Sequence, residues 1–231
     1  DWSSRRVLFR SLGLLLAALL CFFIYRRAND LRWLALAGIL LSIDAGVRYE
    51  AWVFIFLTAL LLVFISGNNK FGSWRHFQSL LVFGLTAGIW PVFWMIHEWR
   101  TYGNPLFALS NNYASIPEQL AVNPAHAGLY QIILVPGVIL LTLTPLVFLG
   151  GFYALLLAIR EARTREIALL AIGFAFFQFR TIATGGSLAM ARYTLTDGTL
   201  LALLAGYGLL RLLEKWPVCS YSSCEIGRAH V

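Results

Sequence analysis

Lone arginines at the ends of long apolar runs are the residues of this chain best suited to bind a phosphate group. The first belongs to the triplet Arg48–Tyr49–Glu50, which separates the apolar runs Trp33–Val47 and Ala51–Ser66. Charged groups at the edge of a bilayer are costly, and a guanidinium matches phosphate oxygens. Glu50 would then hold the guanidinium of Arg48 in place. The alternative is an ion pair that caps a helix turn, with Tyr49 in an interfacial aromatic belt, and the sequence favours neither.

Three further arginines, Arg100, Arg180 and Arg192, occupy similar positions. Arg192 and Tyr193 stand just before the last apolar run, with Asp197 one turn inside it. Here too, phosphate binding and interfacial anchoring by a snorkelling arginine are equally supported. Asp44 lies within an apolar run with no residue beside it to neutralise it, so it is either a functional acid or, more simply, a partner for a neighbouring helix.

A long polar stretch, 97–128, is expected to form an external loop because Asn, Pro, Ser and Gly occur throughout it. Loops of this length are more often functional or disordered than idle. Four of its residues could contact a sugar or an acceptor, and the first two could also transfer a proton or hold a divalent metal: His97, Glu98, Tyr102 and Asn104. A solvated helix end is the simpler interpretation of the first two.

The amino-acid composition indicates which kind of secondary structure positions these residues. The chain is 59% hydrophobic and 13% charged, with a mean hydropathy of +0.74, outside the range of ordinary soluble domains. The sequence therefore predicts an all-α, polytopic transmembrane helical bundle. Its apolar segments, some short or bent by proline, are Leu12–Tyr25, Trp33–Val47, Ala51–Ser66, Phe77–Ile96, Leu129–Ile159 (bent at Pro136 and Pro145), Ile167–Phe179 and Thr194–Leu210. We expect a kink at Trp90–Pro91.

The basic residues predict how the bundle is oriented. Ten lie in loops on one side and four on the other, and the positive-inside rule assigns the richer side to the cytoplasm. Because these residues fall in short loops rather than on one basic face, the net charge of +7 does not indicate nucleic acid. We therefore expect a multi-pass protein of a prokaryotic plasma membrane with its site on the extracytoplasmic face. The ten are Arg26, Arg27, Arg32, Lys70, Arg75, Arg160, Arg163, Arg165, Arg211 and Lys215.

Both ends of the chain look foreign. Glu225–Val231 (EIGRAHV) matches the translation of a common sequencing adapter, and Arg5–Ser11 (RRVLFRS) matches its opposite strand. We therefore expect residues 1–11 to be an adapter-derived tail, 12–218 to be a transmembrane domain and 219–231 to be a non-native or uncertain tail. The native part would be a fragment of a larger protein from environmental DNA.

Three segments together resemble a known family. They are LLSIDAGVRYEAWVFI (Leu40–Ile55), HEWRTYGNPLFAL (His97–Leu109) and ARYTLTDGTLLALLAGYGL (Ala191–Leu209). They are similar to the integral-membrane glycosyltransferases of the GT-C superfamily, especially the polyprenyl-phosphate-mannose-type transferases and their prokaryotic relatives. In these proteins an Arg-Tyr-Glu or Arg-Pro-Glu motif opens a span, Tyr-Gly-Asn-Pro follows an aromatic helix end, and Arg-Tyr precedes a late span. The likeness covers nearly all of Leu12–Leu213.

The resemblance implies an activity. Such enzymes transfer a sugar from a polyprenyl-phosphate donor to a glycan, lipid or protein acceptor, and arginines at the outer boundary hold the donor's phosphate. The catalytic base of the family is an acid in a first external loop, which would precede Leu12. The chain itself would then be inactive. A transporter or flippase for an anionic lipid or solute and a non-catalytic membrane subunit are the alternatives, although a transporter should show mid-span charges and a repeat.

Overall fold

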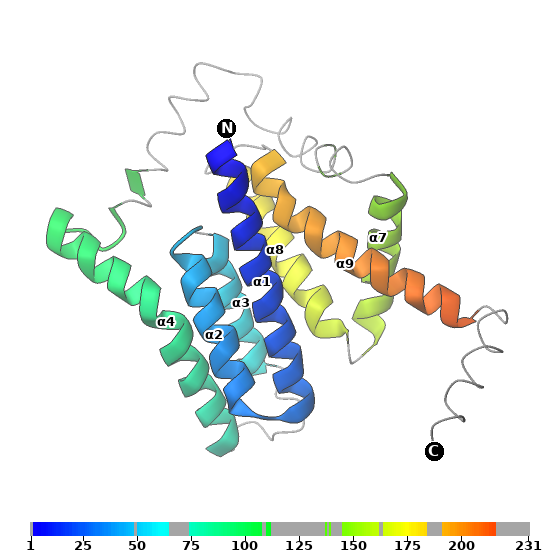
Figure 1. Ribbon diagram of the computed structural model, residues 1–231, viewed down its shortest axis with the longest axis horizontal. Helices are drawn as coiled ribbons and strands as arrows, with labels where there is room; N and C mark the ends of the chain where they lie inside the picture. Colours follow the sequence, from blue (N-terminus) through cyan, green and yellow to red (C-terminus); the bar gives the residue numbers. More distant parts are fainter. Residues whose placement is uncertain are drawn as a thin grey trace. The chain divides into compact units, whose positions relative to one another are not determined.

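The computed structural model describes residues 2–48, 50–64, 74–107, 110–111, 137, 139, 145–161, 164–183 and 191–215. These residues form seven helices and no strand, which confirms the all-α prediction (Figure 1). The chain divides into two units, 1–127 with 176–187 and 128–175 with 188–231, and each is described by itself. The helices are α1 (Trp2–Ala28), α2 (Leu31–Ala45), α3 (Glu50–Phe64), α4 (Trp74–Tyr102), α7 (Pro145–Arg160), α8 (Arg165–Ala183) and α9 (Ala191–Lys215).

Several predicted boundaries are wrong, each where polar residues continue a helix. The expected loop at 97–128 begins later, because α4 continues to Tyr102. Arg180 and the pair Arg192–Tyr193 lie within α8 and α9, not in the loop between them. Pro145 is the first residue of α7, a position that suits a residue with no N–H to donate in the first turn. Residues 112–136 and 216–231 lie outside the described residues.

In the first unit, the turn between α1 and α2 is attached to the start of α4. Asp30 caps α2 by accepting a hydrogen bond from the Arg32 N–H at 3.0 Å. The Arg75 guanidinium donates to the Asn29 carbonyl at 2.6 Å, and the buried Tyr25 hydroxyl donates to Ser79 Oγ at 2.8 Å. The turn and the first residues of α4 therefore lie at the same end of this unit.

Helices α2 and α4 run in the same direction with their backbones close together. A side chain at Gly38 would collide with Thr86. One turn later, Ser42 Oγ accepts a hydrogen bond from the Trp90 N–H at 2.9 Å, and a side chain at Gly46 would lie 2.7 Å from the Trp90 ring. Contacts that advance together along both helices fix their direction and their register.

In the second unit, α7 and α9 also run in the same direction and approach through small residues. A side chain at Gly151 would lie 2.5 Å from the Leu201 carbonyl oxygen, and one at Gly208 would lie 2.8 Å from Ala154 Cβ. Small residues at such positions allow helix backbones to approach closely.

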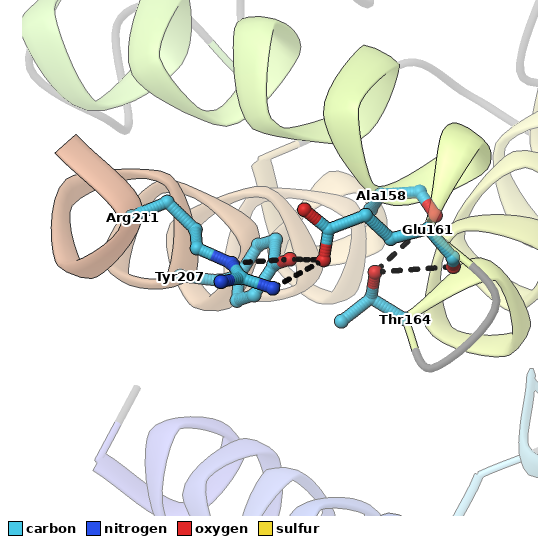
Figure 2. A network of polar contacts seen from close by, with 5 residues as sticks. All are labelled: Ala158, Glu161, Thr164, Tyr207 and Arg211. Carbon is cyan, nitrogen blue, oxygen red and sulfur yellow. Dashed lines mark hydrogen bonds and ion pairs between the residues drawn. The ribbon is translucent and has the colours of Figure 1, made fainter. Parts of the chain in front are cut away.

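A polar network joins the C-terminal end of α7 to α9 (Figure 2). The Tyr207 hydroxyl donates to Glu161 Oε2, and an Arg211 nitrogen lies 2.7 Å from the same oxygen. The Arg211 guanidinium also donates to the Tyr207 hydroxyl at 3.1 Å and lies 5.6 Å from the centre of its ring. Because Arg211 and Glu161 are 40% and 36% exposed, this ion pair adds at most about 1 kcal/mol.

Two stretches, Arg10–Ala28 and Trp74–Tyr102, are long and apolar enough to cross a membrane. Length and composition alone also fit a core helix of a soluble protein, but such a helix is buried. Only 17% of the most apolar window of Trp74–Tyr102 is buried. Its exposed side chains include Leu85, Ile89 and Phe93.

We predict that Gly151→Ala destabilises the second unit by about 1–3 kcal/mol, because the new methyl group meets the backbone of α9. Thermal unfolding in detergent, followed by circular dichroism, measures the effect. The control is Gly206→Ala, at a position with no atom within 4 Å of the added methyl group, where alanine should leave stability unchanged or raise it. Equal melting temperatures for the two variants would contradict the close approach.

Candidate functional site

The candidate site is the turn between α2 and α3, where the sequence predicts phosphate binding by Arg48. Helix α2 ends at Ala45, and the next residues continue its turns: the N–H groups of Val47 and Arg48 both donate to the Asp44 carbonyl at 2.8 Å. The Arg48 carbonyl in turn accepts from the Ala51 N–H at 3.2 Å. Arg48 is therefore held by its backbone between two helices, and its side chain is half-buried.

Asp44 is buried, at 2% exposure, and one helical turn separates it from Arg48. The sequence interpretation left this acid with no neutralising neighbour. Arg48 lies one turn further along, and residues four apart on a helical turn can lie close enough for a carboxylate and a guanidinium to attract each other. Tyr49 lies outside the described residues. Glu50 is the first residue of α3.

Tryptophans surround this turn. The Trp90 ring lies against Gly46, and Trp94 stacks on Trp90 with ring centres 6.4 Å apart. From α3, the Trp52 ring N–H donates to the Ala45 carbonyl at 3.2 Å. The residues Ser42, Trp52, Trp90 and Trp94 were missed as parts of the site, because the sequence does not show which helix faces which. Trp90 beside Pro91 was the one available signal.

The residues expected to contact a sugar lie farther along α4 and in the turn that follows. His97 is exposed, with its ring centre 6.0 Å from that of Trp94, whereas Glu98 is buried at 4% exposure. Tyr102 is exposed and stacks on Phe107, with ring centres 4.1 Å apart. Asn104 Oδ1 accepts from the Leu106 N–H at 3.0 Å, so this side chain stabilises the turn.

The four arginines have different surroundings. Arg48 is half-buried, whereas Arg100 and Arg180 are exposed. At ~1.5 Å per helical residue, Arg100 lies about 15 Å beyond Trp90 along α4. Arg192 is in the other unit, so a phosphate site shared by all four stays a prediction.

The carboxylates and histidines give no metal centre. Among the residues that the structure describes, no group of three or more His, Cys, Asp or Glu side chains could hold a metal ion. The two side chains lie in different environments, because His97 is exposed and Glu98 is buried. The divalent metal considered from the sequence therefore has no ligand set in this part of the chain.

The α2–α3 turn is suited to hold an anion. A half-buried guanidinium is less screened by water than an exposed one, so its attraction to phosphate is stronger. Tryptophan rings offer flat apolar surfaces against which the carbon face of a sugar can pack. Comparison with known proteins adds no identification, because no protein-family model, curated protein or solved structure matches this chain.

We predict that Ser42→Ala destabilises the protein by about 0.5–1.5 kcal/mol, because it removes the hydrogen bond from the Trp90 N–H that joins α2 to α4. Thr101→Ala is the matched control: its hydroxyl also bonds to a backbone group, the His97 carbonyl at 2.9 Å, but at an exposed position. Thermal unfolding of both variants is the measurement. A loss as large in Thr101→Ala as in Ser42→Ala would contradict a specific role for Ser42.

Proposed function

We propose that this chain is part of a membrane-embedded glycosyltransferase of the GT-C type, which uses a polyprenyl-phosphate sugar donor. The observation that carries the proposal is the half-buried Arg48, which lies one turn after the buried Asp44 and two residues after Gly46, against which the Trp90 ring packs. A cation placed this way is costly unless it has an anionic ligand or partner, and it is positioned to bind the donor's phosphate.

Exposed apolar surface supports a membrane location. The middle of helix α4 is apolar and mostly exposed, so lipid is a more suitable neighbour for it than water. Its 29 residues extend about 43 Å, which exceeds the ~30 Å hydrocarbon core of a bilayer. If Arg75 marks one boundary, the opposite boundary falls near Trp94. The half-buried Arg48, near the level of Trp90, would then lie just inside the hydrocarbon edge.

The direction of the helices supports the proposed orientation. In the first unit, Arg75 lies at the α1–α2 turn, next to Arg32, and Arg48 lies at the other end of α2. In the second unit, α7 and α9 run in the same direction, so Arg160 and Arg211 lie at the same end. In each unit, the arginines assigned to the cytoplasm therefore lie at the same end, which agrees with the orientation proposed from the positive-inside rule.

The proposed chemistry is displacement of a lipid phosphate by an acceptor hydroxyl. The bond between the sugar's anomeric carbon and the phosphate oxygen breaks, and the acceptor oxygen forms the new bond to that carbon. Negative charge develops on the leaving polyprenyl phosphate, where the Arg48 guanidinium stabilises it, and Asp44 positions Arg48. The hydroxyl proton passes to a carboxylate that we assign to a segment preceding Leu12 in the complete protein.

A transporter for an anionic lipid is the second candidate. The observation that favours it is the burial of two carboxylates, Asp44 and Glu98, in apolar helices, since such groups mark ion and substrate pathways in transporters. A non-catalytic membrane subunit would need neither the acid nor the arginine.

We predict that Arg32 and Arg160 lie on one side of the membrane and that Val47 and Thr101 lie on the other. Single cysteines are introduced as Arg32→Cys, Arg160→Cys, Val47→Cys and Thr101→Cys after the native cysteines have been replaced by alanine. In intact cells, a membrane-impermeant maleimide should label only the last two, and the first two should react after permeabilisation. Equal labelling of all four in intact cells would contradict the membrane location.

We predict that Arg48→Ala in the complete protein lowers kcat/KM for sugar transfer about 100-fold or more, as expected when a group that stabilises the leaving phosphate is lost. Arg32→Ala, an exposed arginine at the opposite end of α2, should leave transfer unchanged. The assay follows transfer of a labelled sugar from its polyprenyl-phosphate donor, with folding checked by circular dichroism. Unchanged transfer by Arg48→Ala, or donor translocation without transfer, would overturn the proposed function.

A further inference from the structure

We infer that a cleft at the C-terminal end of α4 binds the acyl chain of an anionic phospholipid, with the headgroup on Arg100. The inference rests on the membrane location contained in the proposed function. It does not depend on sugar transfer, because a phospholipid would be bound in the same way whether the protein is a transferase or a transporter.

The cleft has a volume of ≈ 250 Å³ and is lined by Val92, Met95, Ile96, Trp99 and Pro105. The first four recur at the three- and four-residue spacing of one helix face. The fifth is brought to that face by a tight turn: Gly103 has a φ of +70° and donates its N–H to the Trp99 carbonyl at 2.9 Å. Glycine adopts this left-handed conformation without strain and ends the helix.

The lining favours a hydrocarbon chain as the occupant. All five side chains are apolar, and Val92, Ile96 and Trp99 keep 54%, 44% and 64% of their surface exposed. Burying this surface under an acyl chain is favourable by the hydrophobic effect wherever the cleft meets water. The cleft lies where α4 leaves the proposed hydrocarbon core, so one end of it faces lipid chains and the other faces headgroups.

Charge favours an anionic headgroup. Arg100 follows Ile96 by one helical turn, so its side chain projects beside the cleft, and it is exposed. Between 92 and 107, the acidic residue is Glu98, which is buried. An exposed guanidinium at a bilayer surface attracts an anionic phosphate headgroup. Trp99 and Tyr102 add the amphipathic rings that prefer this depth.

The experiment uses the full chain in nanodiscs that contain phosphatidylglycerol with a photoactivatable group in its acyl chain. After illumination, mass spectrometry should find adducts concentrated on residues 92–105. Ile96→Trp, which fills the cleft, should lower these adducts about tenfold, a change of ~1.4 kcal/mol. Ile89→Trp is the matched control: Ile89 is exposed on the same helix but does not line the cleft, so labelling should be unchanged.

The headgroup is tested separately with Arg100→Gln. This variant should lower labelling by phosphatidylglycerol about fivefold, the effect of ~1 kcal/mol, and should not change labelling by a phosphatidylcholine probe. Circular dichroism checks that each variant is folded. A loss that is equal for both lipids would overturn the role of Arg100.

Three outcomes would overturn the site itself. Adducts spread evenly along the exposed face of α4 would indicate unspecific lipid contact. Displacement of the probe by an equimolar amount of polyprenyl phosphate would assign the cleft to the donor. Absence of adducts on 92–105, with the rest of α4 labelled, would show that another part of the protein covers the cleft. Loss of sugar transfer with labelling retained would contradict the proposed function alone.

Discussion

The close packing of α2 against α4 is the constraint on which the first unit depends. Gly38 has no room for a side chain beside Thr86, and Gly46 has none beside Trp90. Ser42, between them, joins the two backbones through the Trp90 N–H. Sliding either helix by one turn would bring a larger residue into these positions. The register therefore fixes Arg48 near the level of Trp90, and the site follows from helix packing rather than from the arginine itself.

The second unit uses the same physical solution with different residues. Within lipid, apolar side chains gain little by leaving one hydrocarbon surface for another, so helices associate through close backbone contact and interhelical hydrogen bonds. Gly151 and Gly208 provide the close contact between α7 and α9, and Glu161 and Tyr207 provide the hydrogen bond. In the first unit, Tyr25 and Ser79 form the corresponding hydrogen bond between helices. This repeated pattern is consistent with a bundle built for a bilayer.

The helices and their order could be predicted because apolar runs of helical length dominate the sequence. The end of α4 could not, because His97–Tyr102 is polar enough to resemble a loop, and the helix ends only where Gly103 turns the chain. The position of Arg48 one helical turn after Asp44 was overlooked because Arg48 was assigned to a break between helices, although the helical turns continue to it. The contact of Ser42 with Trp90 was beyond prediction, since many registers of two apolar helices fit the same periodicity.

In the proposed membrane location, the length of α4 places Arg48 and Arg100 in different environments, which suit them to different roles. About 20 helical residues cross a hydrocarbon core, so a helix that begins at Arg75 reaches the opposite edge near Trp94. In the proposed membrane location, Arg48, near the level of Trp90, lies in a region of low dielectric, where a fixed guanidinium stabilises developing charge most strongly. Arg100 lies past that edge and is exposed, where water and salt weaken its field. Exposure of this kind suits reversible contact with lipid headgroups and does not suit transition-state stabilisation. The half-buried arginine is therefore the stronger candidate for chemistry, although both arginines occupy similar positions in the sequence.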